Sequence, residues 1–433
     1  MKIKQKYIFN DAISEILELL NYYNKLLNSK KELDVQEELN FEDTQIYFYV
    51  ENADITDNDI YTEFIDDLCY IIQTRKNMPK KIEKKESKVD QIRERVKEKP
   101  SELEPVSKQI LIPTGSIMLN LACSDNINGG FAPGKIVNLI GDSSSGKTLL
   151  ALTMFADIVN DPQFDDYRLI FDDAEEALEF DIGYLFGENT AKRIEMDQTS
   201  NTIEDYYGNV LRALSKGKPF IYVLDSFDAI TADEEIKRSK EYENDKSDKS
   251  GSYKTEKARM SSEILRVIKG GIKETKSVVE IISQTRDNIG FGAMFQPKVR
   301  TGGKALKFYS CNEIWLAVGK KVSKNDLEIG ANVMAKVSKN KLTGKKRDIV
   351  FPIFYDYGVD NLQSCIFFLI EQKVWKKEKQ TIHSNDLCLP CTISKLIKEI
   401  EDNNLEQEVF NATQDAWTAR EDSLKLNRKK KYN

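Results

Sequence analysis

The sequence lacks any apolar run long enough to span a membrane, which argues against a membrane-spanning protein. Its first twenty residues are interrupted by Asn10, Asp11 and Glu15, and this does not fit a secretory signal peptide. A positive net charge is also absent, because the 433 residues carry a formal charge of -7. No global attraction to nucleic acid is therefore expected, and any such binding must come from a local basic surface or from loops. We expect the protein to stay in the cytoplasm in which it is made.

Histidine and closely spaced cysteines are scarce as well. His383 is the only histidine, and the six cysteines include a single C-x-x-C pair, Cys388 and Cys391. A structural zinc site needs four ligands, and no second pair of this kind exists. A redox pair or half a zinc site stays open as an alternative. Two unlinked, reduced thiols near a helix start are the favoured interpretation, because nothing marks the chain as secreted.

The length of the chain predicts two or three domains, and its composition divides it further. Residues 1–75 combine two helical patterns with the strand-like TQIYFYV, so we expect a small α+β domain for docking or oligomerisation. Residues 76–105 are charged and almost free of large apolar side chains, which indicates a linker. Residues 375–433 predict a small helical region that ends in a basic tail.

Between these parts, residues 106–374 alternate short apolar runs with longer helical patterns. IVNLI, RLIFDD, FIYVLDS and VVEIIS are rich in β-branched residues and lack clean polar alternation. Such runs are typical of strands that are buried on both faces. Strands of this kind that are separated by helices indicate a mostly parallel sheet flanked by helices, so the predicted fold class is α/β.

The strongest motif in this segment is G-D-S-S-S-G-K-T, a G-x-x-x-x-G-K-[ST] phosphate loop between a strand-like and a helical stretch. Backbone N–H groups of such a loop surround nucleotide phosphates, and the helix N-terminus favours their negative charge. Lys147 is expected to reach the β- and γ-phosphates, and Thr148 to offer its hydroxyl to Mg²⁺. The predicted nucleotide-binding residues of the loop are Gly141, Asp142, Ser143, Ser144, Ser145, Gly146, Lys147 and Thr148.

Carboxylates end two of the later strand-like runs. FIYVLDS places Asp225 where a phosphate loop needs a second group for its metal, although a strand-end aspartate can also simply cap a turn. RLIFDDAEEALEF ends in an acidic cluster, and a carboxylate there can orient the water that attacks the γ-phosphate. Thr148 and Asp225 form the predicted metal site, and ATP and Mg²⁺ are the predicted cofactors.

The order of these motifs resembles the RecA recombinase family, including the phage recombinases of that type. The similarity begins at PTGSIMLNLACSDNINGGFAPGKIVNLIGDSSSGKTLLAL, continues through DDAEEAL, VLDS, IISQTR and RTGGKALKFYS, and ends at KVSKNKLTG. It covers roughly residues 106–372 and leaves both ends of the chain unexplained. It implies a RecA-type ATPase core with small N-terminal α+β and C-terminal helical domains. It also implies an ATP-dependent strand-exchange protein that forms helical filaments on single-stranded DNA.

By position in these motifs, the resemblance implies roles in hydrolysis and nucleotide binding. Glu175 corresponds to the base that positions the hydrolytic water. Gln284 corresponds to the residue that senses the γ-phosphate and couples it to DNA, although a polar strand terminus is the structural alternative. Glu179 stands where the family usually has an aspartate near the nucleotide base, and Tyr184 is not in register with the family's adenine-stacking tyrosine.

The resemblance also implies that the active site is shared between subunits. Lys339 and Lys341 correspond to lysines that cross the subunit interface to the neighbour's γ-phosphate, and Phe308 to a residue that packs there. A lysine row on a strand is otherwise typical of a solvent-facing edge. The predicted catalytic residues are Glu175, Lys147, Gln284, Lys339 and Lys341.

The segment 285–304 resembles the family's second DNA-binding loop. Its cations can meet phosphates and its aromatic side chains can insert between bases, although a flexible surface loop is the alternative. A long charged stretch, 232–255, stands in the position of the first loop, and Arg259 just beyond it matches a basic position of the family. The predicted DNA-binding residues are Arg259, Arg286, Phe291, Phe295, Lys298, Arg300, Gly302, Gly303 and Lys304.

The resemblance therefore implies a DNA-dependent ATPase. Its implied partners are single-stranded DNA, homologous duplex DNA, further copies of itself, and single-strand-binding or loader proteins. The implied location is the nucleoid of a bacterial cytoplasm or the cytoplasm of a phage-infected host. Two alternatives stay open. One is a RecA-fold ring motor of the helicase kind, in which RTGGKALKFYS followed by KVSKNK is not expected; the other is a mediator that binds nucleotide only structurally.

Overall fold

The computed structural model describes ten stretches of the chain, namely residues 2–3, 34–40, 45–51, 110–233, 235–236, 255–287, 298–300, 303–384, 388–429 and 431. The chain forms two compact units, Met1–Ser87 and Lys88–Asn433. In the first unit, β3 (Gln45–Glu51) pairs antiparallel with both β2 (Asp34–Asn40) and β1 (Lys2–Ile3). The strand predicted from TQIYFYV is thus confirmed. The two helices predicted in residues 1–75 lie outside the described residues, as does the linker 76–105.

The second unit is built around a sheet of ten strands, counted over the described stretches. Five neighbouring strands run parallel, in the spatial order β4 (Lys135–Gly141), β8 (Val278–Asp287), β7 (Phe220–Asp225), β5 (Arg168–Asp173) and β6 (Ile194–Glu195). β9 (Lys298–Arg300) pairs antiparallel with the end of β8. The first four parallel strands are those predicted from IVNLI, VVEIIS, FIYVLDS and RLIFDD, so the α/β fold class is confirmed.

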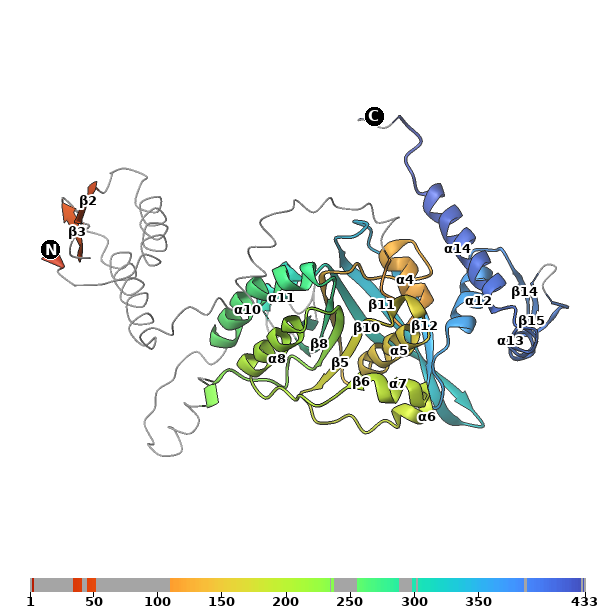
Figure 1. Cartoon of the computed structure of the whole chain (residues 1–433). Helices are drawn as coiled ribbons and strands as arrows, with labels where there is room; N and C mark the ends of the chain where they lie inside the picture. The colour runs from red at the N-terminus through yellow and green to blue at the C-terminus, as the bar shows by residue number, and fades with distance from the viewer. Residues whose placement is uncertain are drawn as a thin grey trace. The chain divides into compact units, whose positions relative to one another are not determined.

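On the other side of β4 the sheet continues with long strands of mixed direction. β10 (Asn312–Lys324) runs parallel to β4 and then forms a hairpin with β11 (Leu327–Asn340), which is followed by β12 (Asp348–Phe354) and β13 (Gly358–Val359). Asn325 and Asp326 make the hairpin turn with φ of 51° and 62°. Both residue types tolerate this left-handed conformation, which a two-residue hairpin turn of this kind requires. The hairpin extends beyond the body of the sheet (Figure 1).

Helices cover both faces of the parallel strands (Figure 1). α4 (Ile117–Ser124) and α5 (Lys147–Val159) pack on one face, and α8 (Ile203–Ser215) and α10 (Thr255–Glu274) on the other. Adjacent residues of β7 enter opposite cores, Val223 with α5 and Leu224 with α8, which explains why the strand is apolar throughout. In the described residues, the connections hold the shorter helices η2 (Pro162–Phe164), α6 (Ile182–Phe186), α7 (Glu188–Arg193) and α11 (Gly303–Tyr309).

The end of the chain forms a smaller layer. It contains α12 (Asn361–Glu371), β14 (Lys376–Glu378), β15 (Thr381–His383), β16 (Cys391–Thr392), α13 (Ile393–Asp402) and α14 (Glu406–Ser423). α13 and α14 agree with the helical region predicted for 375–433. The three short strands were not predicted, because strands of two or three residues leave no period in a sequence. Cys388 and Cys391 are free thiols. No helix in the described stretches has the length and apolar character needed to cross a membrane.

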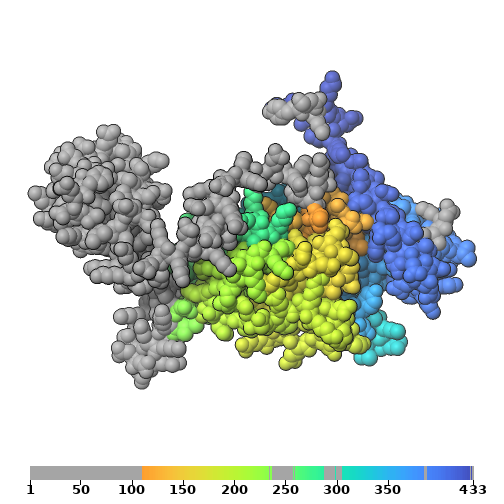
Figure 2. Space-filling view, in the orientation of Figure 1, coloured from red at the N-terminus to blue at the C-terminus, as the bar shows by residue number. Residues whose placement is uncertain are grey.

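α14 holds this layer against the core through one buried tryptophan and one buried carboxylate. Trp417 is fully buried, its ring centroid lies 5.7 Å from that of Phe368, and its Nε1 donates to Asp125 Oδ1 at 3.0 Å. One turn further, Glu421 accepts two hydrogen bonds from Arg347, at 2.8 and 2.6 Å. Figure 2 shows the C-terminal residues (blue) directly beside the segment that contains α4 (orange).

Replacing Glu421 with Gln is expected to lower the free energy of unfolding by about 2 kcal/mol, because Arg347 and Lys345 lose their charged acceptor. These bonds hold the pKa of Glu421 at about 2, below its ordinary 4.5. The stabilisation is therefore fully present above about pH 4.5 and is lost as the pH falls towards 2. Urea unfolding followed by tryptophan fluorescence at pH 7 measures the loss. The control Asp422→Asn removes only an exposed pair with Lys425, and an equal loss there would contradict this role of Glu421.

Candidate functional site

The phosphate loop joins β4 to α5 and requires glycine at two positions. Gly146 has a φ of 86°, and a Cβ added there would meet Ile353 Cδ1 at 2.5 Å. A Cβ on Gly141 would meet the carbonyl oxygen of Leu316 at 2.8 Å. Because Gly146 caps α5 without a side chain, no side-chain cap competes for the N–H groups of the first helical turn. The loop therefore presents backbone donors and the positive end of a helix to an anion.

Lys147 points its ammonium back into this loop. Nζ donates to the carbonyl oxygens of Gly141 at 3.1 Å and Asp142 at 2.7 Å, and the residue is 7% exposed. Burial lowers the pKa of Lys147, while Asp225 and Glu175 act in the opposite direction. The ammonium is thus held inside the loop by the loop's own carbonyl oxygens.

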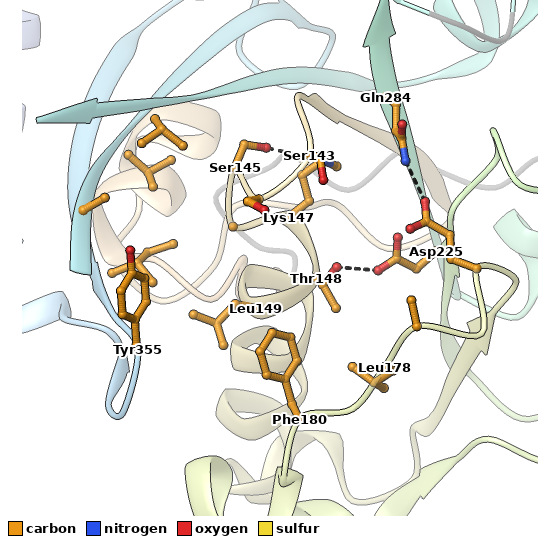
Figure 3. Close-up of a pocket in the computed structure, with 18 of the residues that line it drawn as sticks. Ser143, Ser145, Lys147, Thr148, Leu149, Leu178, Phe180, Asp225, Gln284 and Tyr355 are labelled. Atoms are coloured by element: carbon orange, nitrogen blue, oxygen red, sulfur yellow. Dashed lines mark hydrogen bonds between the residues drawn. The ribbon is translucent and has the colours of Figure 1, made fainter. Parts of the chain in front are cut away.

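Thr148 and Asp225 meet beside this lysine. Thr148 Oγ1 donates to Asp225 Oδ2 at 2.6 Å, as Figure 3 shows. Burial at the end of β7 raises the pKa of Asp225 to about 6. A hydroxyl and a carboxylate are the hard oxygen donors that Mg²⁺ prefers, so the two residues predicted to bind it fit a divalent cation.

Glu175 joins the ends of three parallel strands. It follows β5, and its backbone N–H donates to the carbonyl oxygen of Asp225 in β7 at 3.1 Å. Its Oε1 accepts from Gln284 Nε2 of β8 at 2.9 Å and from the Ser226 hydroxyl. The carboxyl ends of parallel strands meet at one edge of a sheet, where α/β proteins bind ligands. The structure thus brings together the residues predicted for hydrolysis, except Lys339, near the end of β11, and Lys341, just after it.

A cavity of about 700 Å³ lies over these groups. One end is polar and holds the phosphate loop, Glu175, Asp225 and Gln284. The other end is mostly apolar and is lined by Leu149, Leu178, Phe180, Val318 and Tyr355, several of which Figure 3 shows around the cavity. The ion pair of Lys321 with Glu328 also lines the cavity. Phosphates and a flat heterocyclic base fit these two ends, and a pocket of this size suits a nucleotide.

The residue predicted near the nucleotide base does not line the cavity. Glu179 is exposed, and neither it nor Tyr184 is among the residues that line the cavity. Phe180, one position further, lines it with a half-exposed ring, and Tyr355 approaches from the far side. Neither Phe180 nor Tyr355 was predicted from the sequence. Ser226, which donates to Glu175, and Asp228, which accepts from the backbone of Gln284, were not predicted either. Only Ser226 carried a signal, as the last residue of the VLDS motif.

The predicted DNA-binding residues are described only in part. Arg286 is exposed at the end of β8, Lys298 begins β9, and Arg259 is exposed on α10. Three more are placed by backbone alone, with Arg300 in β9 and Gly303 and Lys304 at the start of α11. The remaining predictions, Phe291, Phe295 and Gly302, lie outside the described residues, as does most of the stretch 232–255.

The three residues predicted at the subunit interface lie together. Phe308 is 70% exposed at the end of α11, and its carbonyl oxygen accepts from Lys339 Nζ at 3.2 Å and from Lys341 Nζ at 3.3 Å. The ammonium of Lys341 also lies 5.8 Å from the Phe308 ring centroid. None of the three lines the cavity of its own chain. Two cations and an exposed aromatic ring thus form one surface cluster.

Comparison with known proteins identifies the family of the chain. Residues 80–360 match the family model of the RecA N-terminal domain. The chain is 32% identical over 263 residues to protein RecA of Mesoplasma florum, covering 59% of this chain and 71% of that one. It is 30% identical over 297 residues to protein RecA of Clostridioides difficile, covering 68% and 79%. A crystal structure of the RadB recombinase superposes with a TM-score of 0.40 at 18% identity, covering 57% and 98%. The chain belongs to the RecA family.

Proposed function

We propose that this protein is an ATP-dependent strand-exchange protein of homologous recombination. It assembles as a helical filament on single-stranded DNA and hydrolyses ATP to ADP and phosphate in a DNA-dependent way. The observation that carries this proposal is the 2.9 Å hydrogen bond between Gln284 and Glu175. It connects the carboxylate that orients water to the strand that leads into the second DNA-binding segment, so occupancy of one site can alter the other.

In the nucleotide site, the loop N–H groups and Lys147 bind the β- and γ-phosphates of ATP. Thr148 and Asp225 would hold Mg²⁺, which neutralises charge on the phosphate oxygens. Glu175 accepts a hydrogen bond from a water molecule and orients it for in-line attack on the γ-phosphate. Gln284 fixes the orientation of the Glu175 carboxylate through the bond already described.

At the apolar end, we expect the adenine ring to lie against Phe180 and Tyr355. Replacing Phe180 with Ala should weaken ATP binding about tenfold, because stacking of a base on an aromatic ring contributes roughly 1–3 kcal/mol. Titration with a fluorescent ATP analogue measures this. Tyr184→Ala is the matched control, since that ring is exposed in the same segment but does not line the cavity. An equal loss in both variants, or none in Phe180→Ala, would contradict the assignment.

The surface cluster of Phe308, Lys339 and Lys341 is proposed to contact the ATP site of the next subunit. A head-to-tail contact of this kind does not close, so it generates an open helical filament. ATP would then join neighbouring subunits, and its hydrolysis would release them. Residues 1–75 are proposed to dock on a neighbouring subunit or on a loader or single-strand-binding protein.

Electron microscopy with ATP, Mg²⁺ and single-stranded DNA tests this function directly. Open helical filaments and an ATPase rate that rises with single-stranded DNA are expected. Closed rings would favour a ring motor instead. Because the contacts are made to backbone phosphates and base faces, binding should be salt-sensitive and largely independent of sequence.

Homologous duplex DNA is the second substrate. We place the protein on the DNA of a bacterial or phage-infected cytoplasm.

A further inference from the structure

The end of β8 leaves the main sheet and pairs with β9. The pairs are Thr285 with Arg300, Arg286 with Val299, and Asp287 with Lys298. These two short strand ends form the base of the second DNA-binding segment, and each carries an exposed cation, Arg286 on β8 and Lys298 on β9. Whatever holds these two cations therefore competes with any phosphate that approaches the segment.

Lys298 is held by Asp142 of the phosphate loop. Asp142 accepts from Lys298 Nζ with one carboxylate oxygen and from the Thr285 hydroxyl with the other. The sheet register explains the contact with Thr285, because Gly141 of β4 lies opposite Gln284 of β8 and Asp142 and Thr285 come next. The pairing of β9 with β8 then brings Lys298 to the same place. The two hydrogen bonds lower the pKa of Asp142, so its carboxylate is charged at neutral pH. Asp142 thus bridges both strands at the base of the segment.

The other cation, Arg286, lies beside Asp228 in the turn that follows β7. Asp228 lies three residues after Asp225, and its side chain is 11% exposed. Its Oδ2 accepts from the backbone N–H of Gln284 at 2.6 Å, and its Oδ1 lies 3.9 Å from the guanidinium of Arg286. Two carboxylates, each from an element of the nucleotide site, therefore flank the end of β8.

We propose that Asp142 and Asp228 are positioning residues that occupy Lys298 and Arg286 in place of DNA phosphates while DNA is absent. DNA must displace both carboxylates. Loss of Lys298 leaves Asp142 of the phosphate loop with the Thr285 hydroxyl alone. Loss of Arg286 removes the cation beside Asp228, the residue that accepts from the backbone of Gln284. The inference rests on the proposed function in one respect, namely that these two cations bind DNA. It adds a second connection between DNA and the nucleotide site, beside the bond between Gln284 and Glu175.

A double-mutant cycle tests the Asp142 contact. Binding of a fluorescein-labelled oligo(dT) to the full-length protein without nucleotide is followed by anisotropy in Asp142→Asn, Lys298→Gln and the double variant. Asp142→Asn should bind about two- to fivefold more tightly, since exposed ion pairs of this kind contribute modestly. This gain in affinity for oligo(dT) should disappear when Lys298 is already Gln. Asp326→Asn, which removes an exposed carboxylate at the hairpin turn, should bind like the parent protein.

The measurements distinguish a failure of the proposed competition from a failure of the proposed function. The proposal that Asp142 competes with DNA for Lys298 is wrong in two cases. In the first, Asp142→Asn binds oligo(dT) no more tightly than the parent protein. In the second, the same substitution raises the affinity equally when Lys298 is already Gln. If the parent protein binds no oligo(dT) even with ATP and Mg²⁺, the proposed function fails, and the inference fails with it. The parallel cycle of Asp228→Asn with Arg286→Gln should show the same sign, and its agreement extends the result to the second carboxylate.

Discussion

Replacing Lys147 with Ala is expected to reduce DNA-stimulated ATP hydrolysis by a factor on the order of 100 or more. The ammonium is buried in the phosphate loop and is the one cation that the structure places among the loop carbonyls, within the described residues. Without it, charge that develops on the transferred phosphoryl group loses its nearest compensating donor, and a loss of this kind costs about 100- to 1,000-fold. A coupled assay of ADP release on single-stranded DNA measures the rate.

Lys192→Ala is the matched control for this change. Lys192 is exposed on α7 and pairs only weakly with Glu188, one helical turn before it, at 3.7 Å. Its loss should leave the rate unchanged. If Lys147→Ala turns over ATP at the parent rate, the phosphate loop is not the hydrolytic site and the assignment of the cavity is wrong.

Replacing Glu175 with Gln is expected to lower hydrolysis by about 10² to 10⁴ while ATP binding is retained. The amide keeps an oxygen that can accept from Gln284 and Ser226, so the local structure should persist. The amide is neutral and cannot take the role proposed for the carboxylate, which is to orient the attacking water. Single-turnover hydrolysis and equilibrium binding of ATP, measured on the same preparation, separate the two effects.

Glu176→Gln provides the comparison, because Glu176 is the exposed neighbour of Glu175 and does not line the cavity. This variant should hydrolyse ATP normally. The filaments of Glu175→Gln should also outlast those of the parent protein after free ATP is removed, since hydrolysis is proposed to release subunits. A parallel fall in binding and hydrolysis would instead point to a structural role for Glu175.

The polar half of the site could be predicted from the sequence because its signals are local. IVNLI, RLIFDD and FIYVLDS each place a functional group directly after a buried strand, and parallel strands bring such ends together. The apolar half could not be predicted in this way. Tyr355 reaches the cavity from the turn after β12, and no short motif connects it to the phosphate loop. Phe180 lies in an irregular turn, where a shift of one position changes which side chain faces the cavity.

The same distinction applies to the fold. Buried parallel strands have a characteristic composition, and their prediction was confirmed. The antiparallel strands β11 and β12 were not foreseen as a separate half of the sheet, because strand direction depends on topology and not on residue type. The contact of Asp142 with Lys298 joins positions 156 residues apart and follows only from the pairing of β4 with β8 and of β8 with β9. No spacing in the chain encodes it.

A joint-molecule assay tests strand exchange, the central claim, most directly. Purified protein is assembled on single-stranded DNA with ATP and Mg²⁺ and is then offered labelled duplexes that are either homologous or unrelated. The account predicts joint molecules with the homologous duplex and none with the unrelated one, and it predicts their loss in Lys147→Ala. Filaments that form on the DNA and hydrolyse ATP but yield no homology-dependent product would contradict it.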